Sequence, residues 1–153
     1  MKLGILSDTH GLFDPKLPAL FDGVEHILHG GDVGSGEIIV RLEQIAPVTV
    51  VLGNNDIGMN LRETEVIGLD GRKFLIHHIV DMWRPADGIR DRIAREAPDV
   101  VVFGHTHKPH AEQVDRTLYF NPGYAGPQRF KLSRSVALIH VDGADLRWEY
   151  KML

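Results

Sequence analysis

Short apolar segments alternate with segments of helical spacing over the first third of the chain. The short segments suit buried strands better than helices, and they are residues 3–6, 25–28 and 48–52. Residues 36–46 carry apolar side chains at a helical spacing. A short helix is expected over residues 15–21, with Asp14 as its N-terminal cap and Pro15 in its first turn. This alternation predicts βαβ units on a mostly parallel sheet.

The rest of the chain contains three hairpin patterns. Asp70-Gly71 and Asp142-Gly143 mark two of the turns. The paired strand segments are residues 65–69 with 73–76, 112–114 with 118–120, and 136–141 with 145–150. A helix is expected over residues 87–95. Three hairpins predict a second, largely antiparallel sheet, so the expected fold is α/β, a two-sheet β-sandwich flanked by helices.

One stretch, residues 99–107, joins a buried strand to a polar loop. Its apolar run ends at Gly104, which allows a sharp turn, and His105 and His107 follow two residues apart. Open α/β sheets bind ligands at the carboxyl ends of their strands, and imidazole is the commonest protein metal ligand. Two solvated loop histidines are the alternative interpretation of this stretch alone.

Composition excludes several classes of protein. The 153 residues are enough for one domain, residues 1–153, with a sizeable core. The net charge of −4 provides no overall basic field to attract nucleic acid or anionic lipid. The chain has no cysteine, which excludes disulfides and thiolate metal sites. Asp8 comes too early for a secretory signal, and no apolar run could span a bilayer, so a cytoplasmic location is expected.

Metal-binding residue types recur after the other predicted strands. They are Asp8, His10, Asp32, Asn54 and the pair His77-His78. Neighbouring strands lie about 5 Å apart, so loops at the same end of a sheet bring such side chains together. Carboxylate, amide and imidazole donors without sulfur favour Mn, Fe, Zn, Ni or Co over Ca. The donors outnumber the needs of one ion, which predicts two metals roughly 3.5–4 Å apart.

These motifs in this order resemble the calcineurin-like metallophosphoesterase superfamily. The motifs are Asp8-Thr9-His10, Gly31-Asp32, Gly53-Asn54-Asn55-Asp56 and Gly104-His105-Thr106-His107. The short chain and Asn121-Pro122-Gly123 are similar to its small YfcE-like phosphodiesterase branch. The resemblance covers nearly the whole chain and implies a four-layer αββα fold.

The resemblance also implies a role for each donor. The first metal would be held by Asp8, His10 and His107, the second by Asn54, His78 and His105, and Asp32 would bridge both. The cofactors would be two divalent transition metal ions, with Mn²⁺ expected first and Ni, Fe, Zn or Co as alternatives. Two such ions and two carboxylates leave about +2, which suits a hydroxide and a phosphate ester.

Two positions depart from the pattern of the resembled family. Asn55 stands where many relatives have a histidine that serves as proton donor or phosphate ligand. The branch often has Thr-His-Gly-His after the central hairpin, whereas this chain has Ile76-His77-His78-Ile79-Val80. Aligning the strand ends selects His78 as the ligand and leaves His77 as its competitor, because successive strand residues face opposite ways.

Further candidates surround the predicted ligands. Asn54, Asn55 and Asp56 form the candidate catalytic loop, in which Asp56 would orient its neighbours. Asn55 and Arg129 are candidates for substrate binding, and a solvated arginine is the alternative for Arg129. His29 is expected to pack beneath the site. Trp83 and Tyr124 could line a pocket or an interface.

The resemblance implies a metal-dependent phosphodiesterase in which a hydroxide bridging two metals attacks phosphorus in line. The alternatives are a phosphomonoesterase or nucleotidase on the same site, and a Vps29-like protein-binding scaffold. No expected ligand is missing, which favours an enzyme. The expected partner is a small phosphoester, with no membrane, with nucleic acid only as a substrate, and with a homo-oligomer left open.

Overall fold

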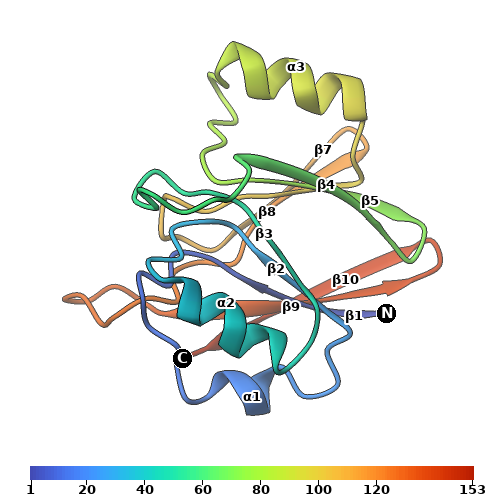
Figure 1. Cartoon of the computed structure of the whole chain (residues 1–153). Coiled ribbons are helices and arrows are strands. Elements are labelled where there is room, and N and C mark those ends of the chain that lie inside the picture. The colour runs from blue at the N-terminus through green and yellow to red at the C-terminus, as the bar shows by residue number, and fades with distance from the viewer.

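A computed structural model describes residues 1–153 and contains two five-stranded sheets that pack face to face. Helices α1 (Leu17–Leu20) and α2 (Gly36–Glu43) cover the outer face of one sheet. Helix α3 (Asp87–Glu96) covers the outer face of the other, as Figure 1 shows. The predicted two-sheet sandwich with helices on both sides is therefore confirmed.

The first sheet has the strand order β10-β9-β1-β2-β3. Its strands are β1 (Lys2–Leu6), β2 (His26–His29), β3 (Val48–Val50), β9 (Ser135–Asp142) and β10 (Asp145–Met152). Strands β1, β2 and β3 are parallel, with α1 and α2 in the connections between them. This part of the sheet confirms the predicted βαβ units.

The second sheet has the strand order β4-β5-β6-β8-β7. Its strands are β4 (Thr64–Leu69), β5 (Arg72–His77), β6 (Val100–Val102), β7 (His110–Val114) and β8 (Thr117–Asn121). Two antiparallel hairpins form its edges, β4 with β5 and β7 with β8. Strand β6 lies between them and is parallel to both neighbours, because the chain returns through α3 before entering it.

The prediction that all three hairpins build the second sheet is wrong. The β9-β10 hairpin belongs to the first sheet, where β9 pairs antiparallel with β1 and Leu3 lies opposite Ile139. Both faces of β9 are apolar: Ile139 faces the core between the sheets, and Leu138 faces the helical side. A turn sequence specifies which two strands form a hairpin, but the third strand that extends the sheet is a non-local partner.

Helix α1 is shorter than predicted and is not capped by Asp14. One oxygen of the Asp14 carboxylate accepts a hydrogen bond from the Lys16 N–H at 2.9 Å, and the other lies 2.8 Å from Arg134 Nη2. This carboxylate therefore links the start of α1 to the segment that enters β9. Helix α2 begins as predicted, at Gly36, where the Ser35 side chain accepts a hydrogen bond from Glu37 N–H.

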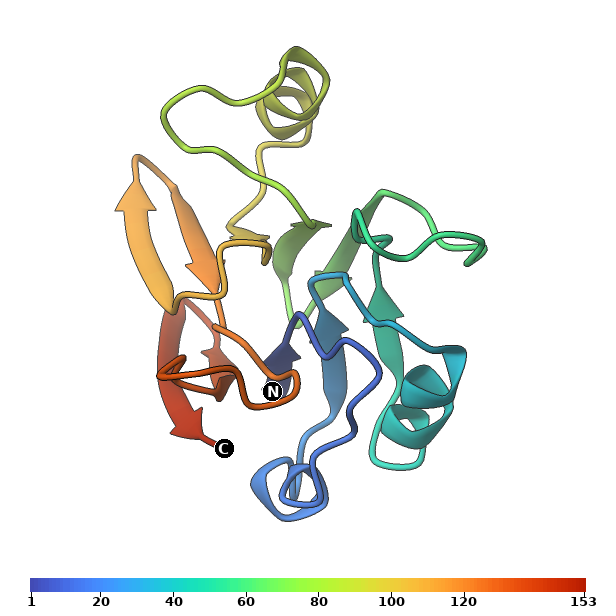
Figure 2. The ribbon, with the colours of Figure 1, turned by 90° about the vertical axis from the view of Figure 1, so that its left-hand side faces the viewer.

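The parallel strands place their following loops at one end of the sandwich. The core between the sheets includes Leu3, Ile5, Phe74 and Val102, which hold β1, β5 and β6 in contact. Figure 2 looks onto this end, where the loops after β1, β2, β3, β5 and β6 surround the middle of the view. The predicted metal-binding residues all lie in these loops. None of the helices has the length and apolar character needed to cross a membrane.

Candidate metal centre

The loop after β1 supplies one group of donors together with the loop after β6. Asp8 is fully buried, and its Oδ1 lies 3.2 Å from His107 Nε2 and 3.9 Å from His10 Nε2. These three atoms lie within 4.8 Å of one another, as expected for ligands of a single ion. The three residues predicted to hold the first metal therefore lie together.

A second group adjoins the first through the two carboxylates. His78 Nε2 lies 3.4 Å from Asp32 Oδ2 and 3.9 Å from Asp8 Oδ1. Asn54 Oδ1 lies 3.0 Å from His78 Nε2 and 3.1 Å from His105 Nδ1. Asp32 Oδ2 is also 3.8 Å from His10 Nε2, so this carboxylate lies between the two groups. All seven predicted ligands thus meet at one place.

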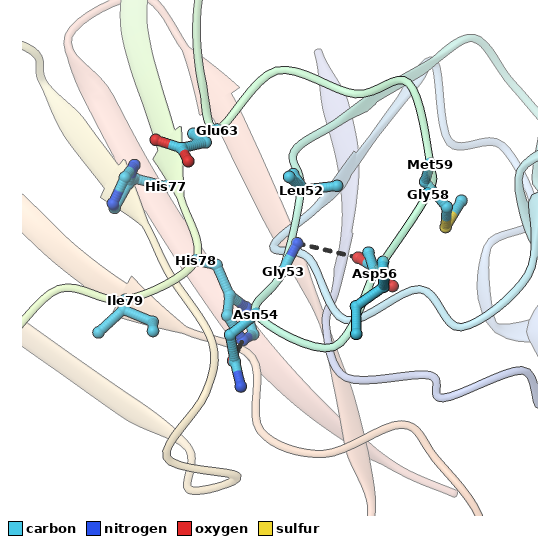
Figure 3. A pocket seen from close by; sticks show the side chains of 11 residues that line it. Leu52, Gly53, Asn54, Asp56, Gly58, Met59, Glu63, His77, His78 and Ile79 are labelled. Carbon is cyan, nitrogen blue, oxygen red and sulfur yellow. Dashed lines mark hydrogen bonds between the residues drawn. The ribbon is translucent and has the colours of Figure 1, made fainter.

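The side-chain directions of His77 and His78 differ, and only His78 faces this cluster. His77 Nδ1 lies 2.8 Å from Thr64 Oγ1 on the neighbouring strand, and Figure 3 shows its ring beside Glu63. In the same view His78 points toward Asn54. Consecutive residues at a strand end project to opposite sides, which is why one of the pair reaches the cluster.

The hydrogen bonding of His78 leaves its Nε2 as a free ligand atom. Its Nδ1 donates to the Gly30 carbonyl at 2.7 Å, which leaves Nε2 as the ring nitrogen that faces the cluster. His78 Nε2 faces oxygen atoms of Asp32 and Asn54, and a cation bound between these three donor atoms would be stabilised by all of them. A backbone carbonyl that holds the other ring nitrogen is the usual support of a metal-binding histidine.

Burial makes the carboxylates costly without a cation. Asp8 Oδ1 and His10 Nε2 are buried and have no hydrogen-bond partner. Burial raises the pKa of Asp8 and lowers the pKa of His10 from their ordinary values. Burial also opposes ionisation of Asp32, but two hydrogen bonds from Asn55 lower the pKa of this carboxyl overall. The donor types and the unpaired buried atoms fit divalent cations.

Comparison with known proteins identifies the family. A family profile described as the calcineurin-like phosphoesterase superfamily domain matches residues 1–144. The chain belongs to this superfamily. A probable metallophosphoesterase of Methanothermobacter thermautotrophicus is 34% identical over 155 residues, which cover 95% of this chain and 89% of that protein. A phosphodiesterase of Methanocaldococcus jannaschii is 32% identical over 142 residues, which cover 80% of this chain and 83% of that protein.

A solved structure supports the fold of this phosphoesterase chain. Vps29 of Entamoeba histolytica, crystallised with Zn²⁺, matches with a TM-score of 0.76 and 23% identity over 99% of both chains. At that identity the likeness concerns the fold alone. The calcineurin-like resemblance stated from the sequence motifs is confirmed. The candidate metal ligands of this chain lie close together in the structure.

Asn55 and Asp56 act on the phosphoesterase site through its loops. Asn55 donates to Asp32 from its backbone N–H at 2.9 Å and from its side-chain Nδ2 at 2.7 Å. The buried Asp56 carboxylate accepts three backbone N–H groups, from Val33 at 3.1 Å and from Gly34 and Gly53 at 2.9 Å. Asp56 therefore holds the loop after β2 against the loop after β3, and Asn55 orients Asp32.

His29 lies beneath the site in a buried hydrogen-bond chain. Its Nδ1 accepts from Gly31 N–H at 3.1 Å, so its Nε2–H donates to Thr9 Oγ1 at 3.0 Å, and Thr9 donates onward to the Val33 carbonyl. Complete burial lowers the pKa of His29 to about 3, which keeps the ring neutral. It braces the loops after β1 and β2, in line with the expected packing role.

Tyr124 forms the wall behind two of the histidines. Its ring is fully buried, with centroids 4.5 Å from the His107 ring and 6.0 Å from the His10 ring. The exposed Arg129 guanidinium lies 5.7 Å from the centre of the same ring and contributes to the lowered pKa of His10. From the sequence, Tyr124 could line either a pocket or an interface. Its contacts in the folded chain place it against the predicted ligands His10 and His107.

Proposed function

We propose that this calcineurin-like phosphoesterase is a metal-dependent phosphodiesterase with a dinuclear centre. The observation that carries the proposal is the position of Asp32 Oδ2, within 4 Å of a histidine nitrogen from each donor group. Asp8, His10 and His107 would hold one ion, Asn54, His78 and His105 the other, and Asp32 would bridge them. Bound divalent ions supply Lewis acidity and lower the pKa of a bound water.

The chain itself contributes charge, rigidity and orientation. The buried carboxylates Asp8 and Asp32 attract the cations, while the neutral donors add no further negative charge. Asn55 holds Asp32 through two hydrogen bonds, so the bridging carboxylate is oriented in advance. Arg129 stands on the Tyr124 side of the centre, where its guanidinium can reach a phosphate oxygen.

A preference for diesters follows from two features of the site. Asn55 takes the position where many relatives carry an imidazole, so the leaving oxygen lacks an evident proton donor. General acid catalysis is worth about 10²–10⁴-fold, and esters with good leaving groups depend on it least. A diester also brings less negative charge than a monoester dianion. Activated phosphodiesters should therefore be cut faster than the matching monoesters.

The deciding experiment combines metal content with catalysis. Elemental mass spectrometry should find two transition metal ions per chain, with Mn²⁺ restoring activity after chelation. Hydrolysis of bis(p-nitrophenyl) phosphate should exceed that of p-nitrophenyl phosphate in kcat/KM with the same metal. A monoester preference would move the assignment to a phosphomonoesterase or nucleotidase. One bound ion at saturation would exclude the dinuclear centre.

Asp32→Asn tests the bridging role. Replacing groups that only orient metal ligands lowers metal affinity or activity about 10–100-fold. Loss of the bridging carboxylate should therefore lower kcat/KM by more than about a hundredfold. Asp22→Asn is the matched control, because Asp22 is exposed and lies outside the cluster. Binding of both ions by Asp32→Asn with near-normal kcat/KM would contradict the proposal.

A binding scaffold is the competing function, because the same fold occurs in Vps29. The complete donor set, with buried unpaired atoms at its centre, supports catalysis instead. A purified protein that binds metal but cleaves no phosphoester with any of the five candidate metals would favour the scaffold. We further propose a cytoplasmic location and a small phosphoester substrate.

A further inference from the structure

Two hollows meet at the donors proposed for the second metal. The first has a volume of about 400 Å³ and is bordered by Asn54 and His78, with Ile57 and Met59 on its outer side. Figure 3 shows Asn54 and His78 at the inner edge of this hollow. The second has a volume of about 670 Å³ and begins at His105 on the other side of the same donors. Both hollows are therefore bordered by donors proposed for the same metal.

Ile79 separates the two hollows and lines both. Its side chain is 44% exposed, although it directly follows the buried His78. The two hollows thus diverge from the centre on either side of an apolar ridge. A tetrahedral phosphorus bound at the donors would direct its two ester substituents along diverging paths of this kind.

Exposed apolar side chains gather at these hollows. Ile57 is 93% exposed beside the smaller hollow, and Trp83 is 88% exposed beside the larger one. The backbone of this loop is tied at Trp83, because the Asp81 carboxylate accepts the backbone N–H groups of Trp83 and Arg84 at 2.9 and 3.0 Å. Large apolar groups exposed together commonly mark a binding site.

The walls of the larger hollow suit a flat ring. Phe103 and Pro109 form apolar sides, and the largely exposed Trp83 adds an aromatic ring. Stacking on an aromatic side chain accepts any planar ring and needs no hydrogen-bond pattern. The smaller hollow, with Ile57 and Met59, lacks an aromatic ring other than histidine.

We propose, given the phosphodiesterase function, that the two hollows receive the two ester arms of the substrate. The arm in the larger hollow is a planar ring, a nucleobase or an aryl group, that stacks on Trp83. The arm in the smaller hollow lies against Ile57. The substrate class is then a phosphodiester with at least one aromatic arm, and Trp83 determines specificity.

Binding is tested first, without turnover. The chain has only two tryptophans, so the indole N–H signals of Trp83 and Trp148 can be followed separately by NMR and assigned with Trp83→Ala. With Zn²⁺ present, thymidine 5′-monophosphate and phenyl phosphate should shift the Trp83 signal and leave Trp148, on β10, in place. Methyl phosphate, which has no ring, should move neither. Comparing the two ring compounds distinguishes a nucleobase site from a general aryl site.

Kinetics provide the second measurement. Trp83→Ala should raise the KM for bis(p-nitrophenyl) phosphate about tenfold with a smaller change in kcat, because a lost stacking contact costs about 1–3 kcal/mol. Ile57→Ala should raise KM less. The matched control is Phe130→Ala, which removes an even more exposed aromatic side chain that lines neither hollow. Phe130→Ala should leave both constants unchanged.

Three results would overturn the inference. Trp83→Ala and Phe130→Ala with the same KM as the wild type would exclude the Trp83 subsite and leave the phosphodiesterase function intact. A Trp83 signal that shifts with protein concentration instead of with nucleotide would indicate contact between two copies of the chain. Absence of metal-dependent hydrolysis in the wild type would remove the phosphodiesterase function and the inference together.

Discussion

Five of the seven proposed metal ligands have left-handed backbone conformations. Asp8, His10, Asp32, His105 and His107 have φ values of 56°, 46°, 54°, 67° and 60°. Such a conformation costs about 1–3 kcal/mol for a residue other than glycine, and it clusters at functional sites. Hydrogen bonds between the loops help to hold it in place, among them Asp8 N–H to the Gly31 carbonyl at 2.9 Å. The chain thus fixes the donor directions before any ligand binds.

Substitution of the adjacent histidines separates ligand from neighbour. His78→Ala removes the imidazole that faces Asp32, so it should lower metal occupancy at the second position and reduce kcat/KM by more than about tenfold. His77→Ala removes a ring bound to Thr64 that lies away from the donors, so it should leave metal occupancy unchanged and lower kcat/KM less than His78→Ala does. Metal content and kcat/KM of both variants check this. An inactive His77→Ala with an active His78→Ala would reverse the assignment.

His29 makes stability depend on pH in a defined direction. The folded ring has a pKa of about 3 and the unfolded ring about 6.5, so the unfolded chain binds the extra proton between these values. The stability that the neutral His29 ring contributes is complete above pH 6.5. As the pH falls toward 3, the free energy of unfolding decreases by about 1.4 kcal/mol per pH unit. Denaturant unfolding with chelator present should show the wild type losing stability faster than His29→Gln over this range. Parallel curves would contradict the neutral, buried ring.

The loops between elements are packed too closely for added atoms. A Cβ on Gly53 would collide with the Asp32 backbone N, and a Cβ on Gly104 would lie 2.6 Å from Asp8 Oδ2. Asp56 adds three backbone hydrogen bonds that join the loops after β2 and β3. Strand ends that approach this closely let carboxylates from different loops share one site.

Gly104→Ala tests this close approach. The added methyl group presses on Ser7 and Asp8, so it should lower the free energy of unfolding by about 1–3 kcal/mol and weaken metal binding. Gly68→Ala on β4 is the control, because a Cβ there meets nothing within 4 Å, and it should be neutral or slightly stabilising. Denaturant midpoints and metal titrations check both. A Gly104→Ala protein with wild-type stability would show that the loop after β6 adjusts freely.

At the scale of the whole molecule, the candidate metal ligands come from both sheets. Asp8 and Asp32 come from loops of the first sheet, whereas His78, His105 and His107 come from loops of the second. The apolar core between the sheets brings these two groups of residues together. The carboxylates of Asp8 and Asp32 are buried there, and Asp8 Oδ1 has no hydrogen-bond partner. Cations bound there should therefore stabilise the packing of one sheet on the other.

Metal binding should raise the stability of the folded protein by mass action. An ion that binds only the folded chain adds about 2.7 kcal/mol at a concentration of 100 times its Kd. Scanning calorimetry should show a higher Tm with Mn²⁺ or Zn²⁺ than with chelator, and Asp32→Asn should lose most of that shift. An equal Tm with and without metal in the wild type would contradict a site that exists only in the folded chain.

Much of the fold could be predicted from local sequence. Strand and helix periods, the Asp-Gly turns and the Gly104 strand end depend on near neighbours, and the structure places these elements close to their predicted positions. The donor types of the metal centre could also be predicted, because chemistry resides in residue identity. Helix α1 begins two residues later than expected, and Asp14 pairs with Arg134, which is distant in sequence, instead of capping the helix.

The sequence by itself determined the order of the elements, the donor set and the family to which they belong. The tertiary structure alone decided which sheet receives the β9-β10 hairpin and that Asn55 binds Asp32. It also placed Tyr124 behind the histidines and opened two hollows on either side of Ile79. The reason is physical: local periodicity and turn chemistry act over a few residues, whereas sheet partners, side-chain directions and cavities depend on packing between distant segments.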